Sequence, residues 1–247
     1  MTGRFRALLV PALVAGVLPW SAAARADSFT PEQRAEIITI MRNALKQDPS
    51  ILRDAVSAMQ ADESAKTQAK TQAAIAKMQD QLVSATDPIA GNPHGDVTIV
   101  EFFDTRCPYC RKLEPVMAQF LAEDGHVRLV YKDLPILGPA SVLGTKALLA
   151  AQNQNGYEKL RDLIMKMPPD TTLPQIEAAA RQSGLDWDKL SRDMNDPSVQ
   201  ARINDNLKLA RALEIQGTPA LVIGKDLIPG AVDLNDLREA VATARKG

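Results

Sequence analysis

The sequence predicts an α/β domain with the element order βαβ, helical insertion, ββα, preceded by an α-helical N-terminal region. Three observations support this fold class. Two β-rich runs, at residues 97–103 and 127–131, flank a segment with helical periodicity. Strand character returns at residues 220–223, after a long section that is helical in pattern. Residues 27–86 have helical periodicity and no strand signature.

The size and composition of the chain favour a folded protein with a large core. Its 247 residues are 45% hydrophobic, which is enough for one large domain or for a domain with an appendage. The 29 lysines and arginines are balanced by 30 aspartates and glutamates, for a formal net charge of -1. This balance provides no basic surface, so we expect no nucleic-acid partner.

The beginning of the chain has the pattern of a secretory signal peptide. Two arginines precede an apolar run over residues 7–20, and the small-residue stretch 22–26 follows. The run holds two prolines and is shorter than the roughly 20 residues of a membrane-spanning helix, which disfavours an anchor. We therefore expect residues 1–26 to be cleaved after Ala26 and the protein to be exported to an oxidising compartment.

Residues 27–86 are predicted to form two short amphipathic helices and a linker. Thr30-Pro31-Glu32-Gln33 is a favourable helix start, and Asp48-Pro49 starts the second helix in the same way. Large apolar residues are absent from 60–71, which indicates an exposed helical linker. Two such small helices cannot bury their apolar faces alone. We favour self-association over docking on the main domain, because the polar spacer separates the two.

The main domain is predicted to span residues 87–247. Its first strand, its first helix and its second strand form a βαβ unit, with two cysteines at the start of the helix. A helical insertion follows at about 138–213. The last elements are the strand at 220–223, a turn at Gly224-Lys225-Asp226 and a closing helix from Leu234 to Ala244. Within the insertion, three prolines mark helix starts: Pro139, Pro174 and Pro197.

Cys107 and Cys110 are the only cysteines, and their use is predicted to be chemical. A two-residue spacer closes too small a loop to stabilise a chain of this length. A thiol at the first turn of a helix faces unpaired amides and the positive end of the helix dipole, which favour the thiolate. Cys107 is therefore the predicted nucleophile and the more exposed thiol, and Cys110 the buried resolving thiol. Pro108 fits the first helical position and stiffens the turn.

Other uses of this cysteine pair are half of a zinc site or an inert disulfide. Zinc would need two more ligands, and the only histidines, His94 and His126, have no spacing that indicates a site. We expect neither a metal nor a cofactor. An alternative of another class is a copper(I)-binding or chaperone module, because two soft thiolates can hold Cu(I).

Two motifs resemble those of the DsbA-like thiol-disulfide oxidoreductases. Residues 101–110, EFFDTRCPYC, are similar to the active-site segment of that family, and Gly217-Thr218-Pro219-Ala220 resembles its cis-proline loop. The resemblance covers residues 87–247 and implies a thioredoxin-like fold with a helical insertion. It implies that Pro219 is cis and lies beside Cys107, with the Thr218 backbone binding an extended substrate peptide.

The resemblance also assigns roles in redox tuning. Glu101 falls where the family has a buried acid that relays protons to the inner cysteine, and burial should raise its pKa. Lys132 ends the next predicted strand, where it either pairs with Glu101 or is solvated. Tyr109 replaces the histidine of the best-known oxidases and supplies no cation. Together with Thr218, this replacement favours isomerisation of wrong disulfides over oxidation.

The N-terminal region is similar to the oligomerising stalk of the ScsC-like proteins of the suppressor-of-copper-sensitivity family. This likeness implies a homotrimeric periplasmic isomerase that acts on misfolded or unfolded exported proteins with cysteines. It also implies a membrane reductant of the DsbD type that keeps the cysteines reduced. The alternative is a DsbA-like dithiol oxidase with a quinone-linked membrane partner.

Overall fold

A computed structural model describes residues 29–247, and the predicted signal peptide at residues 1–26 lies outside this part. The chain divides into two compact units between Met59 and Gln60. In the part of the chain that the structure describes, no helix has the length and apolar character needed to cross a membrane.

The first unit contains α1 (Pro31–Gln47) and the beginning of α2 (Ser50–Lys77). The predicted start of α1 is confirmed, because Thr30 and Gln33 cap each other: Gln33 N donates to Thr30 Oγ1 at 3.3 Å and Thr30 N to Gln33 Oε1 at 2.9 Å. No residue of α1 is buried. Large apolar side chains are exposed along this unit: Phe29, Ile38, Ile40, Met41, Leu45, Ile51, Leu52, Val56 and Met59.

The helix α2 runs without a break through the residues predicted as a linker. Residues 60–71 consist of Ala, Gln, Lys and other residues that a helix tolerates, with no Gly or Pro to end it. After α2 comes the short helix α3 (Gln79–Leu82). Ile75 and Leu82 are buried in one core cluster with residues of the sheet, such as Val100. Residues 60–86, which the sequence places in the N-terminal region, therefore pack in the second unit.

The second unit is built on a five-stranded sheet with the order β1-β3-β2-β4-β5. The predicted βαβ unit is confirmed: β2 (Val97–Phe103) and β3 (Val127–Asp133) are parallel neighbours joined by α4 (Pro108–Glu123). The strand β1 (Ile89–Gly91) pairs antiparallel with β3. It was not predicted, because three residues beside Pro88 are too short a segment for a period-two pattern to appear.

The C-terminal elements agree with the prediction. The strand β4 (Ala220–Ile223) pairs antiparallel with β2 and with β5 (Asp226–Pro229), and the turn between β4 and β5 is Gly224-Lys225. Gly224 has a φ of +61°, which the turn of a two-residue hairpin requires. The closing helix α10 (Leu234–Ala244) has its predicted bounds.

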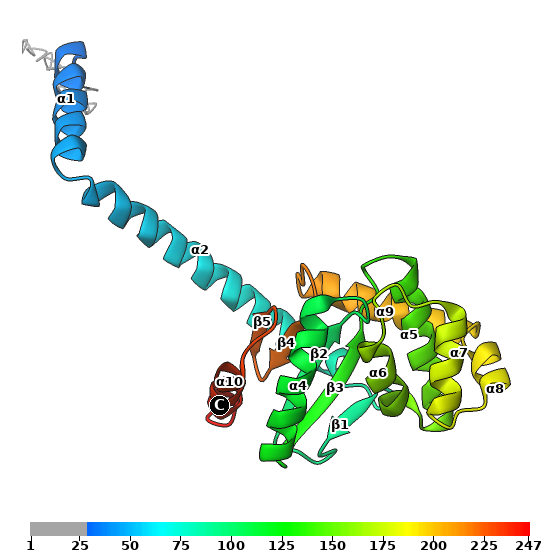
Figure 1. Cartoon of the computed structure of the whole chain (residues 1–247). Coiled ribbons are helices and arrows are strands. Elements are labelled where there is room, and N and C mark those ends of the chain that lie inside the picture. Colours follow the sequence, from blue (N-terminus) through cyan, green and yellow to red (C-terminus); the bar gives the residue numbers. More distant parts are fainter. Residues whose placement is uncertain (1–28) are drawn as a thin grey trace, which may run out of the picture. The chain divides into compact units, whose positions relative to one another are not determined.

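The helical insertion has the predicted place between β3 and β4. Helices begin at Pro139 and Pro197 as predicted, and Pro174 is the second residue of its helix. Figure 1 shows α5, α6, α7 and α8 close together. The elements of the insertion are α5 (Pro139–Ala151), the 3₁₀ turn η1 (Gln152–Gln154), α6 (Tyr157–Lys166), α7 (Leu173–Gln182), α8 (Trp187–Asp193) and α9 (Pro197–Ala212).

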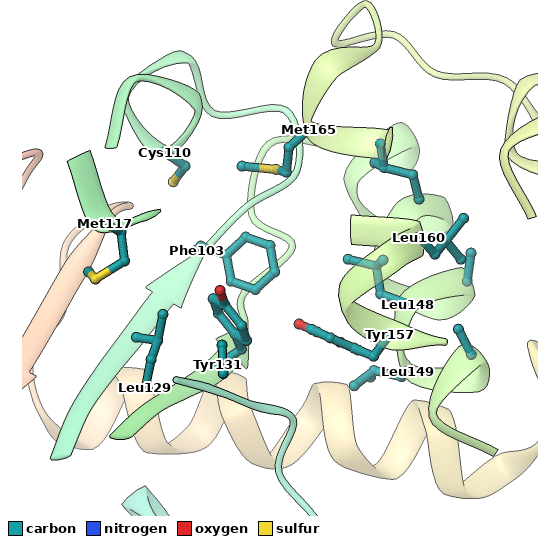
Figure 2. Packing of buried hydrophobic residues seen from close by; sticks show 14 of the residues in the cluster. Phe103, Cys110, Met117, Leu129, Tyr131, Leu148, Leu149, Tyr157, Leu160 and Met165 are labelled. Atoms are coloured by element: carbon teal, nitrogen blue, oxygen red, sulfur yellow. The ribbon is translucent and has the colours of Figure 1, made fainter. Parts of the chain in front are cut away.

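The two faces of the sheet bury different clusters. Phe103 and Tyr131 belong to the larger cluster, where their rings meet edge to face with centroids 5.7 Å apart. Figure 2 shows both rings beside Tyr157, the first residue of α6. Val100 and Phe102 belong to the second cluster. Because side chains alternate along a strand, Glu101 shares the face of Phe103, which is also the face that packs against Cys110 and the insertion.

Candidate active site

Cys107 is the residue immediately before α4, as predicted. It is the N-cap, in an extended conformation, and Pro108 is the first helical residue. Both cysteines are free thiols, with exposed fractions of 4% for Cys107 and 0% for Cys110. Cys107 is therefore the less buried thiol, although the difference is small. Its sulfur lies at a helix N-terminus, where unpaired amides and the helix dipole favour negative charge.

The loop that precedes β4 contacts this thiol directly. Cys107 Sγ donates a hydrogen bond to Thr218 O at 3.1 Å. The Thr218-Pro219 peptide bond is cis, as the resemblance implied. This contact brings together two segments that lie far apart in the sequence, because β4 pairs with β2, the strand that leads into the cysteines.

Asp104 organises the loop between β2 and Cys107. Its buried carboxylate accepts hydrogen bonds from Arg106 N at 2.8 Å, and from Ile136 N at 2.8 Å and Leu137 N at 3.0 Å. These bonds hold the loop after β2 against the loop after β3. No role was predicted for Asp104 from the sequence. The signal was an aspartate directly after a buried strand, where its side chain can bond neighbouring backbone amides.

Two arginines link the loop that precedes Cys107 to the helical insertion through hydrogen bonds. Arg111 donates through Nη2 to Thr105 O at 2.6 Å, and through Nη1 to Met167 O. Arg106 donates through Nε to Pro169 O at 3.2 Å. The segment between α6 and α7 is thereby held beside the cysteines.

Tyr109 lies between the cysteines and is exposed, with 58% of its surface accessible. The ammonium group of Lys112 lies 5.4 Å from the centre of its ring, which is a cation-π distance. The ring presents an apolar surface next to the thiols and brings no charge of its own.

Glu101 is fully buried on β2, six residues before Cys107. Neither of its carboxylate oxygens has a hydrogen-bond partner in the described part of the chain. Burial raises the pKa of Glu101 to about 7, the charges of Glu114 and Asp133 add to this rise, and Arg161 opposes it. The predicted burial and raised pKa are confirmed.

The predicted pairing of Lys132 with Glu101 is wrong. Glu101 is in register with Tyr131, and Lys132 is in register with Phe102, so Lys132 points to the opposite face of the sheet. There Lys132 Nζ donates to Asp87 Oδ2 at 2.6 Å and to Gln81 O at 2.7 Å. Lys132 is thus a buried structural cation that ties β3 to the segment before β1.

The cation beside Glu101 is Arg161 of α6. Its Nη2 lies 3.7 Å from Glu101 Oε2, and its two terminal nitrogens bind the carboxylate of Glu114 at 2.6 and 2.5 Å. The guanidinium carbon lies 4.0 Å from the ring centre of Tyr131 and 4.5 Å from that of Phe103. Sequence reasoning missed Arg161, because only the packing of the insertion on the sheet brings it to β2.

Burial favours the protonated form of the inner thiol. Burial raises the pKa of Cys110, and the negative charges of Glu101 and Cys107 add to the rise, while a hydrogen bond with the Asp104 backbone opposes it. Cys110 must lose this proton before it can act as a nucleophile. Glu101 is the neighbouring carboxylate whose pKa is suited to receive a proton near neutral pH.

A family model and several known proteins are similar to this chain in sequence. A family model described as thioredoxin matches residues 83–243. The Na⁺/H⁺ antiporter NhaA 1 of Salinispora arenicola is 26% identical over 163 residues, which cover 65% of this chain and 25% of the antiporter. The chain thus spans about a quarter of the length of that relative. The thiol:disulfide interchange protein DsbA of Burkholderia cepacia is 26% identical over 149 residues, covering 58% of this chain and 69% of that protein.

Two solved structures are also similar to this chain in sequence and in fold. A thioredoxin-like oxidoreductase of Silicibacter pomeroyi is 41% identical, with a TM-score of 0.66 over 68% of this chain and 98% of its own. ScsC of Proteus mirabilis in a transitional conformation is 27% identical, with a TM-score of 0.65 over 89% of this chain and 98% of its own. The chain therefore belongs to the thioredoxin family, among its DsbA-like oxidoreductases.

Proposed function

We propose that this protein is an oligomeric, periplasmic thiol-disulfide oxidoreductase that isomerises or reduces wrong disulfides in exported proteins. The observation that carries the proposal is the hydrogen bond from Cys107 Sγ to Thr218 O at the N-terminus of α4. It puts the less buried thiol beside a carbonyl that can hold a client backbone. Cys110, one turn further along the helix, supplies the second thiol.

The exchange begins when the Cys107 thiolate attacks one sulfur of a client disulfide. The client S–S bond breaks, a mixed disulfide with Cys107 forms, and the second client sulfur leaves as a thiolate. In isomerisation, another client thiolate attacks the mixed disulfide and regenerates Cys107 without net electron transfer. In reduction, Cys110 attacks Cys107 instead, so the client gains two electrons and the two cysteines become a disulfide.

Glu101 is the proposed proton acceptor for Cys110. The thiol stays protonated because it is buried, and its attack on Cys107 requires that the proton leave as the new S–S bond forms. A carboxyl group with a pKa near 7 is partly ionised at neutral pH, so it can take this proton and later release it to water. Among the residues that the structure describes, neither Glu101 oxygen has a hydrogen-bond partner, so both are available to accept the proton.

Thr218 is the proposed anchor for the client chain. Its carbonyl accepts a hydrogen bond from the Cys107 thiol, and this donor is lost once the sulfur has become part of a disulfide. A backbone N–H of an extended client can then take its place. The same interaction would align the client sulfur with Cys107.

Two observations support isomerisation over oxidation. Tyr109 provides no cation between the cysteines that would stabilise the Cys107 thiolate. The likeness to ScsC of Proteus mirabilis extends over 89% of the chain and so includes much of the N-terminal helical region. An isomerase must be kept reduced, so we propose a membrane reductant of the DsbD type as its redox partner.

The proposed location is the periplasm. The signal-peptide pattern of residues 1–26 supports export, and a solved protein of Salmonella Typhimurium that is described as periplasmic and thioredoxin-like is 29% identical over 69% of this chain. Exported proteins with unpaired or wrongly paired cysteines are the proposed clients.

The exposed apolar side chains of α1 and the first part of α2 support self-association. Ile38, Met41 and Leu45 follow one another at helical spacing and are all exposed in the single chain. We propose that they pack against copies of the same helix in a trimer. Joining several active sites in one particle would raise the local concentration of a second site at a bound client.

Refolding of scrambled ribonuclease tests the proposal. The reduced full-length protein should restore ribonuclease activity, and Cys107→Ser should abolish this effect. Cys110→Ser keeps the nucleophile, so it should retain part of the isomerisation and lose net reduction. A wild-type protein that oxidises a reduced peptide but leaves scrambled ribonuclease inactive would contradict an isomerase and indicate an oxidase.

A further inference from the structure

Asp133 is a second buried carboxylate on the face of the sheet that carries Glu101. It is the last residue of β3 and is fully buried. Glu101 is in register with Tyr131, two residues before Asp133, so both carboxylates lie on the same face of neighbouring strands. A strand spacing of about 4.8 Å and a rise of about 3.3 Å per residue put their Cα atoms roughly 8 Å apart. The exchange proposed above gives a role to Glu101 and none to Asp133.

A single helix contacts both carboxylates. Tyr157 and Arg161 are four residues apart on α6, so they lie on one face of it. Tyr157 Oη donates to Asp133 Oδ2 at 2.9 Å, and Arg161 Nη2 lies 3.7 Å from Glu101 Oε2. Figure 2 shows the Tyr157 hydroxyl pointing from α6 towards the strands. The beginning of α6 therefore connects the surroundings of the two carboxylates.

Both carboxylates are incompletely satisfied. Asp133 Oδ1 and both oxygens of Glu101 have no hydrogen-bond partner among residues 29–247. The charged and titratable groups around the pair come from α4, β3, α6 and α9: Cys110, Glu114, Tyr131, Tyr157, Arg161 and Arg202. Two of these groups are arginines, and Arg161 also binds Glu114. The core therefore contains more carboxylates than it can fully compensate.

The two carboxyl groups have similar proton affinities. Burial raises the pKa of Asp133 to about 7, while the hydrogen bond from Tyr157 and the charges of Arg202 and Arg161 oppose the rise. The pKa of Glu101 is also raised to about 7, and the negative charge of Asp133 contributes to that rise. Ionisation of one carboxyl group therefore disfavours ionisation of the other.

Asp133 lies next to a cavity beside α9. Its backbone carbonyl accepts a hydrogen bond from Asn206 Nδ2 at 3.0 Å, and Asn206 lines the cavity together with Lys132. The volume of about 420 Å³ has room for several water molecules. The lining residues include neither Cys107 nor Thr218. Asp133 can thus exchange a proton with water away from the sulfur that holds the client.

We propose that Glu101 and Asp133 share one proton, and that Asp133 releases a proton to this cavity when Glu101 accepts the proton of Cys110. This inference rests on the proposed function and deepens it. As Cys110 Sγ bonds to Cys107 Sγ and the client leaves as a thiolate, the Cys110 proton passes to Glu101. Glu101 then carries no charge, so Asp133 becomes more acidic and gives its proton to water. In the reverse direction, Cys110 recovers its proton from Glu101, and Asp133 takes one from water.

Replacing Asp133 by Asn tests the pair through the rate of Cys110 attack. Asn keeps an oxygen that can accept the hydrogen bond from Tyr157 but carries no charge. Because the charge of Asp133 raises the pKa of Glu101, its loss should let Glu101 ionise at lower pH. The pH dependence of the attack should therefore shift to lower pH, with a rate at about pH 6 that is about threefold higher. Rapid-quench measurement of client release gives this rate.

Asp205→Asn is the matched control for this substitution. Asp205 lines the same cavity and pairs with Lys208 on the surface of α9, so its loss should leave the pH dependence of the wild type unchanged. A folded Asp133→Asn protein whose pH dependence stays in place or moves to higher pH would overturn the proposal.

Tyr157→Phe is a second variant, which keeps the Asp133 carboxyl group. It removes the hydrogen bond that lowers the pKa of Asp133, so Asp133 should stay neutral over a wider pH range. The neutral form does not raise the pKa of Glu101, and the attack should again shift to lower pH. A shift to higher pH would contradict the coupling.

Carbon-13 NMR of the two carboxyl groups tests the pair without a client. In the wild type, each signal should titrate in two steps, as two sites that share a proton do. Glu101→Gln should leave Asp133 with a single step at lower pH, and Asp133→Asn should have the same effect on Glu101. Single steps in the wild type that neither substitution moves would overturn the pair, while disulfide exchange would stand. Two-step titration in a protein that exchanges no client disulfide would instead contradict the proposed function.

Discussion

Arg161 Nη2 lies 3.7 Å from Glu101 Oε2 in the core, where both side chains are almost completely buried. The same guanidinium binds Glu114 at shorter distances and lies against the rings of Tyr131 and Phe103. Glu101 therefore has a cation near it, but neither of its oxygens accepts a hydrogen bond from any residue of the described range 29–247. In this environment the pKa of Glu101 is raised to about 7, which suits its proposed role as the proton acceptor for Cys110.

Replacing Glu101 by Gln should slow the attack of Cys110 on the mixed disulfide at Cys107. In the wild type, the rate should rise with pH and level off above about 7, because Glu101 accepts a proton only when ionised. Glu101→Gln should lower the rate at neutral pH about 100-fold and remove this rise near pH 7. Rapid-quench measurement of client release across the pH range checks both effects.

Glu123→Gln is the control, because this glutamate ends the same helix α4 and binds Arg238 on the surface. It should keep the wild-type rate and pH profile. A Glu101→Gln protein with an unchanged profile would show that another group takes the proton.

Replacing Arg161 by Met should shift the pH dependence of Cys110 attack to higher pH. The arginine lowers the pKa of Glu101, so its loss should raise that pKa and require a higher pH for ionisation. The variant should also lose about 3–5 kcal/mol of stability, because two carboxylates are left without their buried partner. Arg181→Met removes a surface ion pair with Glu177 and should do neither. A profile that moves to lower pH, or remains in place, would contradict the role assigned to Arg161.

The packing of α5 against the loop that precedes Cys107 predicts that Gly144 cannot be replaced by a larger residue without loss of stability. A Cβ at Gly144 would lie 2.8 Å from Thr105 Oγ1, a buried side chain just before Cys107. Gly144→Ala should therefore destabilise the protein by about 1–3 kcal/mol, even though alanine favours the helix. Gly125→Ala is the control, because no atom of the described part of the chain lies within 4 Å of its added Cβ. Thermal unfolding of both variants measures the difference, and equal unfolding temperatures would contradict this packing.

The exposed face of α1 predicts the effect of charge on assembly. Ile38→Glu combined with Met41→Glu should convert an oligomer into single chains, because buried carboxylates in a helix interface are costly. Asn43 is also exposed on α1 but is polar, so Asn43→Glu is the control and should leave the oligomer intact. Light scattering of the full-length protein measures the mass. A wild-type protein with the mass of one chain would refute the proposed trimer.

Local sequence signals predicted much of the fold. The capping pair of Thr30 and Gln33, the helix starts at Pro139 and Pro197, and the two-residue turn at Gly224 each depend on neighbouring residues. Cys107 was placed correctly at the N-cap for the same reason, because Pro108 marks the first helical position.

The remaining features depend on tertiary contacts. From its position near the end of a neighbouring strand, Lys132 was expected either to pair with Glu101 or to be solvated. It does neither, because one residue of register decides the face on which a side chain lies, and Lys132 is buried on the opposite face. Arg161 reaches Glu101 only after the insertion has packed on the sheet. The burial of Ile75 likewise follows from its packing against residues of the sheet.

Trapping of the mixed disulfide tests the central claim most directly. Reduced Cys110→Ser and Cys107→Ser proteins are each mixed with a client disulfide, the free thiols are alkylated, and the linked cysteine is identified by mass spectrometry. The geometry at Thr218 predicts that Cys110→Ser accumulates the client on Cys107 and that Cys107→Ser accumulates little. Accumulation of the client on Cys110 in the Cys107→Ser protein, with none on Cys107 in the other variant, would contradict the assignment.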